Sequence, residues 1–181
     1  GTVGTRQAME DVRRFLLRVR EELDAVVAHP ALVTQVMGGV AKALRLMAQK
    51  AEFGTVAGPE AKILTVGTAA TSAQRANAAL AAALEEVCAA LGAVAPQLPA
   101  TPRSLLEQAL SQVAEVAAEA MAPVIKAAAE ACDAQVLLMH KEDWAGGPPP
   151  GERCSAYMAG LIQVFVYLRE EHLSRVQQRG G

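Results

Sequence analysis

Large apolar residues recur at alternating three- and four-residue steps along most of this 181-residue chain. The first series lies within residues 6–28, and the second follows Pro30. They consist of Met9, Val12, Leu16, Val19, Leu23 and Val26, and then of Val33, Val36, Val40, Leu44, Met47 and Ala51. Residues three and four apart share one face of an α-helix, so the spacing predicts two amphipathic helices that pack through their apolar sides. His29 and Pro30 interrupt the pattern. Because this connection is short, the two helices are expected to pack antiparallel.

A third helix is predicted from Thr71 to about Val94. Thr71 and Gln74 have the spacing of a capping box, in which each side chain binds the other residue's backbone N–H. Residues 53–70 before it lose the helical periodicity and contain three glycines and a proline, so they are expected to form a connection.

The longest periodic series extends over about 40 residues after Thr101 and Pro102. These two residues suit an N-cap and a first helical position. Pro123 lies inside this series, which predicts a kink near residues 119–123 or a break into two helices. After the Gly- and Pro-rich residues 146–151, a fifth helix is predicted, with an apolar face formed by Tyr157, Leu161, Val164, Leu168 and Val176.

The composition favours helices over strands. Aromatic residues make up only 3% of the chain and isoleucine occurs three times, whereas strands are usually rich in both. The predicted fold class is all-α: an elongated antiparallel helical bundle or rod of about five long helices. Residues 1–181 are expected to form a single bundle fragment of a longer rod, with flexible connections near residues 53–70, 95–101 and 144–152.

Charge and cysteine content argue against several functional classes. The formal net charge of −2 gives no electrostatic case for nucleic acid. Cys88, Cys132 and Cys154 are widely spaced and odd in number, so neither a disulfide framework nor a structural zinc site is expected. A reducing, cytosolic environment is expected instead. The uncharged runs are too short for a transmembrane helix. No signal peptide is visible at the start of the chain, and the absence of an initiator Met favours a fragment.

No set of residues predicts catalytic, metal-binding or cofactor-binding chemistry. His140 and Glu142 lie two positions apart and so point to different sides of a helix. Glu85 and Glu86 beside Cys88 would raise the pKa of its thiol and make it a poor nucleophile. The chain is therefore not expected to be an enzyme.

The fifth helix offers the best candidates for contact with a protein partner. Its stretch from Val164 to Leu168 is apolar nearly all round, which is typical of a helix that is central or covered by a partner. The candidate contact residues are Trp144, Tyr157, Val164, Tyr167 and Leu168, with Trp144 at the edge of the surface.

One segment is more distinctive than helical periodicity. The string Met-His-Lys-Glu-Asp-Trp-Ala-Gly occupies residues 139–146, and after a Pro-rich loop Cys-Ser-Ala-Tyr-Met occupies residues 154–158. This pattern resembles the fifth-subunit family of the conserved oligomeric Golgi complex. Pro123 before Val-Ile and the Gln-Arg-Ala-Asn sequence at residues 74–77 also look like that family. The resemblance covers residues 70–175, whereas residues 1–52 match in pattern only and the high alanine content departs from the family.

The resemblance implies a structural subunit of a vesicle-tethering complex on the cytosolic face of the Golgi, with a peripheral, indirect membrane association. It implies a role in retrograde intra-Golgi transport through contacts with the other complex subunits, especially the seventh, and without a cofactor. A helical adaptor of the talin or vinculin type is the alternative, and an all-α enzyme is the least favoured. The adaptor predicts a closed monomer, whereas the tether predicts exposed apolar surface.

Overall fold

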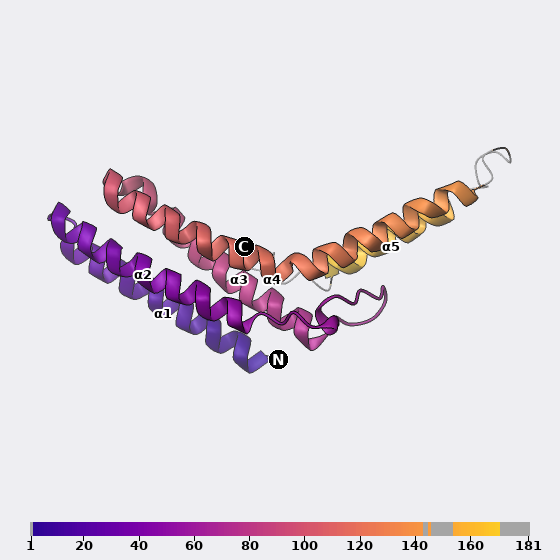
Figure 1. Ribbon diagram of the computed structural model, residues 1–181, viewed down its shortest axis with the longest axis horizontal. Coiled ribbons are helices and arrows are strands. Elements are labelled where there is room, and N and C mark those ends of the chain that lie inside the picture. The colour runs from indigo at the N-terminus through magenta and orange to yellow at the C-terminus, as the bar shows by residue number, and fades with distance from the viewer. Residues whose placement is uncertain (1, 143–144, 146–153, 171–181) are drawn as a thin grey trace. The chain divides into compact units, whose positions relative to one another are not determined.

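The computed structural model describes residues 2–142, 145 and 154–170. Five α-helices occur in these residues, with no strand among them (Figure 1). They are α1 (Thr2–Val26), α2 (Pro30–Gly54), α3 (Ser72–Gly92), α4 (Ala100–Leu138) and α5 (Ala156–Leu168), with short 3-10 helices at Pro59–Ala61, Ala95–Gln97 and Met139–Lys141. The prediction of an all-α fold is confirmed.

The chain divides into two compact units. Unit 1 consists of Gly1–Val56 and Ala76–Met121, and unit 2 consists of Ala57–Arg75 and Ala122–Gly181. The sequence predicted a single bundle fragment over residues 1–181. That prediction is tested by unfolding measurements: a single bundle should unfold in one cooperative transition.

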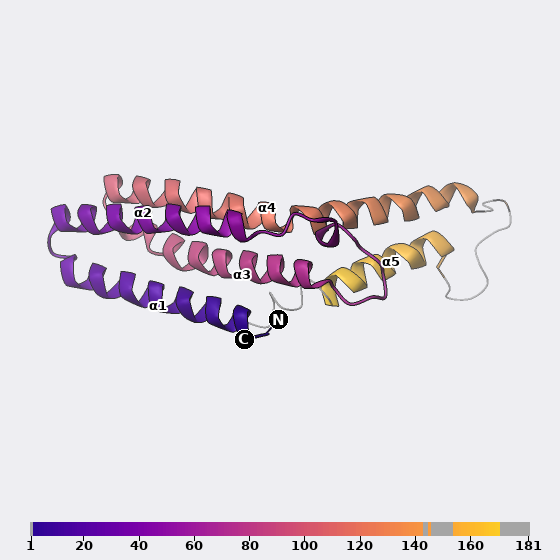
Figure 2. The same cartoon turned by 60° about the horizontal axis from the view of Figure 1, so that its bottom comes forward.

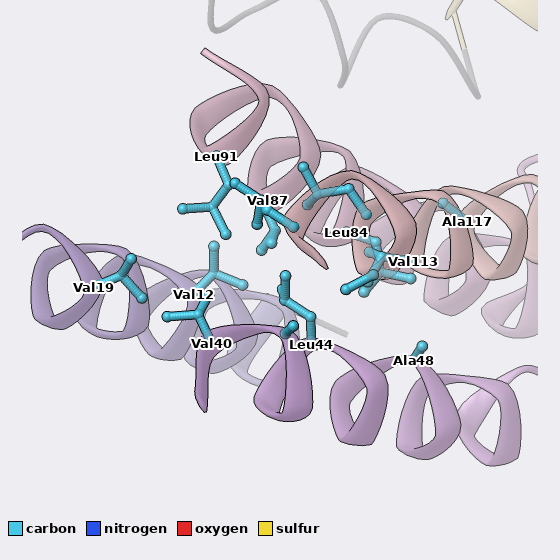
Figure 3. Packing of buried hydrophobic residues seen from close by; sticks show 14 of the residues in the cluster. Val12, Val19, Val40, Leu44, Ala48, Leu84, Val87, Leu91, Val113 and Ala117 are labelled. Atoms are coloured by element: carbon cyan, nitrogen blue, oxygen red, sulfur yellow. The ribbon is translucent and has the colours of Figure 1, made fainter. Parts of the chain in front are cut away.

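The core of unit 1 is built by α1, α2, most of α3 and the first part of α4, which run alongside one another (Figure 2). Each helix contributes the apolar series expected from its periodicity, and the side chains meet in one cluster (Figure 3). Its members include Val12, Val19, Val40, Leu44, Leu84, Val87, Leu91, Val113 and Ala117. Many of the buried positions are alanines, and these small side chains allow the helix backbones to approach closely while burying little apolar area each.

The connection between α2 and α3 is fastened by the start of α3. The predicted capping box is confirmed: Thr71 Oγ1 accepts the Gln74 N–H at 3.1 Å, and Gln74 Oε1 accepts the Thr71 N–H at 2.9 Å. Gln74 also donates to the Ile63 carbonyl, and the Arg75 guanidinium donates to the Ala70 carbonyl. The polar side chains of Gln74 and Arg75 therefore form hydrogen bonds with the backbone of the connection.

The start of α4 corrects a prediction. The helix begins at Ala100, and the Arg103 N–H donates to the Pro99 carbonyl at 3.0 Å, so Thr101 lies inside the helix and is not its N-cap. Pro102 is tolerated because the first-turn N–H groups have no partner within the helix. The Arg103 guanidinium donates to the carbonyls of Ala95, Pro96 and Leu98 at 2.9–3.1 Å, which ties together the turn between α3 and α4.

Pro123 lies inside α4, which is one uninterrupted helix of 39 residues. The predicted alternative of two separate helices is therefore wrong. A proline here costs the helix one backbone hydrogen bond, and the carbonyl it would have reached is that of Glu119. The boundary between the units falls between Met121 and Ala122, in the same turn.

In unit 2, α5 lies against the second half of α4 (Figures 1 and 2). Gly160 faces Gln135 of α4: an added Cβ would overlap the Gln135 amide and lie 3.2 Å from Gln135 Cγ. Val164 and Tyr167 follow Gly160 at helical spacing and are buried. The predicted continuation of this helix to Val176 lies outside the described residues.

Candidate protein-interaction surfaces

The structure places the predicted contact residues in different environments. Val164 and Tyr167 are buried in unit 2, while Tyr157 and Leu168 are half-buried. Trp144 lies outside the described residues. Val164 and Tyr167 therefore hold α5 in place, and a partner could contact them only after α5 moved.

A second apolar stripe on α5 faces solvent. Its members are Met158, Ile162, Phe165 and Val166, of which Ile162 is 49% and Phe165 is 60% exposed. Steps of four and three residues put them on one side of the helix. We call this set the α5 stripe. Four neighbouring apolar side chains in water are typical of an interaction site more than of scattered surface residues.

The sequence alone could not separate the α5 stripe from the buried face. Nearly every residue from Leu161 to Leu168 is apolar, so hydrophobic periodicity does not distinguish the two sides of this helix. The usable signal was Gly160. A glycine inside a helix often marks close approach by another backbone or side chain, and the face that continues from it through Val164 and Tyr167 is the buried one.

Unit 1 carries an elongated apolar groove of about 900 Å³. One wall is α1 from Arg13 onward, together with Val27 just after the helix, and the opposite wall is the end of α3 with the turn that follows it, from Ala90 to Pro99. Pro30 and Val33 at the start of α2 complete the lining. We call this feature the α1/α3 groove. It arises at helix ends, so the periodicity of the separate helices carried no signal for it.

Charges on α1 form exposed pairs along the helix. Arg14 pairs with Glu10, Arg18 with Glu21 and Glu22, and Arg20 with Asp24, at N–O distances of 2.8–4.0 Å. Exposed pairs of this kind each contribute little stability. Because acids alternate with the arginines, this helix does not present the unbroken basic surface that a phosphate backbone requires.

The described residues hold little reactive chemistry. Within them, no group of three His, Cys, Asp or Glu residues could hold a metal ion. Asp143, next to Glu142, lies outside the described residues. Burial raises the pKa of the half-buried Cys88 thiol, and of the two carboxylates that the sequence predicted to do so, Glu85 raises it further. The Cys88 thiol donates to the Leu110 carbonyl at 3.7 Å, a contact typical of a packing residue.

Two helical stretches, Pro30–Gly54 and Ser72–Gln97, are long and apolar enough to cross a membrane. Core helices of soluble proteins can have the same length and apolar composition. Both stretches contribute to the core of unit 1, through Met37 and Leu44 in the first and Leu84 and Val87 in the second. The length and composition of these two stretches are therefore weak evidence for a membrane span.

No protein-family profile matches the chain. No solved structure matches it either. The chain is similar to conserved oligomeric Golgi complex subunit 5 of Arabidopsis thaliana, with 26% identity over 174 residues. The similarity covers 96% of this chain but only 21% of the plant protein, so the chain spans about a fifth of the length of that relative. This distant similarity supports a relationship between the chain and subunit 5 of the Golgi complex.

Proposed function

We propose that this chain is a helical segment of a tethering-complex subunit on the cytosolic face of the Golgi. It would act by holding other subunits during retrograde vesicle transport and would be attached to the membrane only through the complex. The observation that supports this proposal most directly is the similarity to subunit 5 along 96% of the chain. The described residues offer packing and apolar surface but no convergent polar chemistry, as suits a scaffold.

The proposed partner surface is the α5 stripe, with Tyr157 and Leu168 at its edges and Trp144 nearby in sequence. Ile162 and Phe165 are large enough to serve as apolar anchors, and such anchors supply most of the affinity in protein interfaces. The partner we propose is the seventh subunit of the same complex. Val164 and Tyr167 support the surface from beneath.

Co-purification of the 181-residue chain with the other complex subunits of the same organism tests this function. Ile162→Asp and Phe165→Asp should abolish capture of the seventh subunit, since each places a charge at the centre of the apolar surface. Leu46→Asp is the matched control: Leu46 is also exposed, but lies on α2 in unit 1. Circular dichroism should report unchanged helicity for all three variants.

Two results would contradict the proposal. Capture that is unaffected by both α5 variants would remove the α5 stripe as the partner surface. A folded wild-type chain that captures no complex subunit would overturn the tethering function itself. If that chain bound a partner only after partial destabilisation, the adaptor alternative would replace it.

A further inference from the structure

We propose that the α1/α3 groove binds an acidic amphipathic helix of a partner protein. The groove belongs entirely to unit 1 and is distinct from the α5 stripe. The inference deepens the proposed function, because it assigns a partner chemistry to a second surface of the same scaffold. Its test uses the 181-residue chain and a peptide, without any complex subunit. Peptide binding can therefore fail while subunit capture succeeds, and subunit capture can fail while peptide binding succeeds.

The dimensions of the groove suit a helix. Its α1 wall runs from Arg13 to the end of the helix at Val26, which at 1.5 Å per residue is roughly 20 Å long. This length matches about four turns, or about 14 residues, of a bound helix. The volume of about 900 Å³ is at the upper end for pockets that hold compact small molecules.

The groove is also incompletely covered by its own chain. Leu17 is 62% and Val27 is 75% exposed, although both are large apolar side chains on the same wall. Leu16 and Leu23, which also line the groove, are only half-buried. A helix with leucines at i, i+3, i+4 and i+7 would cover these side chains in the way that known helix-in-groove complexes do.

Charge favours an acidic helix over a basic one, because Arg13 and Arg20 place two positive charges in the groove lining against the single negative charge of Asp24. Arg13 and Arg20 lie seven residues apart, which places them two turns apart on the same side of α1, at the groove. Within the described residues Arg13 has no ion-pair partner, and Arg20 is 4.0 Å from Asp24 in a highly exposed pair. Two acidic side chains at the same seven-residue spacing would pair with both arginines.

The test compares two fluorescent peptides of about 15 residues that share the leucine pattern. One carries glutamates beside the leucines and the other carries lysines. Fluorescence anisotropy should show about tenfold tighter binding of the glutamate peptide, and added salt should reduce this preference. The double variant Arg13→Glu, Arg20→Glu should reverse it. Arg14→Glu, on the same helix but outside the groove lining, is the matched control and should leave it unchanged.

The apolar part of the site is tested by Leu17→Ser and Val27→Ser, which should weaken binding of the glutamate peptide without unfolding unit 1, because both side chains are exposed. Equal affinity for the two peptides, or binding that ignores these substitutions, would overturn the proposal. Vesicles of phosphatidylcholine and phosphatidylserine provide the other arm. If they bind through Arg13 and Arg20 while the glutamate peptide does not bind, the groove recognises lipid and the proposal is wrong.

Discussion

The side-chain amide of Asn77 binds both backbone groups of Val56. Asn77 Oδ1 accepts the Val56 N–H at 2.9 Å, and Asn77 Nδ2 donates to the Val56 carbonyl at 3.0 Å. Asn77 is only 1% exposed. One buried side chain in α3 therefore satisfies both backbone hydrogen-bonding groups of Val56, just after the end of α2.

Replacing Asn77 by alanine should lower the free energy of unfolding by about 1–3 kcal/mol, because Val56 would lose both hydrogen-bond partners. Asn77→Asp should also destabilise, since a carboxylate keeps the acceptor but loses the donor and buries a charge. Urea denaturation followed by circular dichroism measures both effects. Gln108→Ala, which removes an exposed amide on α4, is the control and should change little. An unchanged midpoint for Asn77→Ala would contradict the assigned role.

Gly38 and Gly39 should be replaceable by alanine with a gain in stability. A Cβ at either position would meet no atom within 4 Å, and both lie inside α2. Each substitution should therefore add about 0.5–1 kcal/mol through helix propensity. Gly160→Leu is the contrasting case: its side chain would overlap the end of the Gln135 side chain, which would have to turn away, so no gain in stability is expected. Thermal unfolding of the three variants checks this; a loss of stability in Gly38→Ala and Gly39→Ala would refute it.

Val164 and Phe165 are neighbours in sequence with opposite expected effects. Val164→Ala should destabilise unit 2 by about 2 kcal/mol, since it removes buried methyl groups and leaves a cavity. Phe165→Ala should change stability by no more than about 0.5 kcal/mol, because its ring is mainly in water. Hydrogen exchange read by mass spectrometry locates each effect. Faster exchange confined to α5 and the second half of α4 is expected for Val164→Ala alone.

Much of unit 1 could be predicted from the apolar periodicity. Met9, Val12 and Val19 were expected on one face of a helix and are buried together. The capping box was also predictable, because both of its interactions are local. The start of α4 was not, since it depends on how Arg103 binds the preceding carbonyls.

The candidate surfaces were less predictable for a different reason. Periodicity shows that a helix has an apolar side, but α5 has apolar residues on both sides, and only its tertiary packing decides that Val164 and Tyr167 are buried while Ile162 and Phe165 are exposed. The α1/α3 groove depends on where Val27 and Leu98 come to lie when three helix ends meet. Such positions are set by tertiary contacts and leave no local pattern in the sequence.

Cys88 should be a slow thiol at neutral pH, because its raised pKa leaves little thiolate. Mass spectrometry after brief treatment with iodoacetamide should find Cys154, which is exposed, modified before Cys88. The folded protein binds the thiol proton more tightly than the unfolded chain does. The contribution of Cys88 to stability is therefore full below the ordinary thiol pKa and is lost as pH rises through the raised value. Cys88→Ala should flatten this alkaline decline, and a decline of equal size in the variant would contradict it.

In mechanical terms, Pro123 should act as a yield point, the place where a stretched helix opens first. Tension along α4 is carried by backbone hydrogen bonds, and the turn that contains Glu119 and Pro123 has one fewer. That turn should unwind first, lengthening from about 1.5 Å to about 3.3 Å per residue, before the packed core of unit 1 gives way. Pro123→Ala should raise the force of the first extension in an optical trap, and an unchanged force would place the yield point elsewhere. A helix built this way limits the peak load that reaches whatever is attached at its two ends.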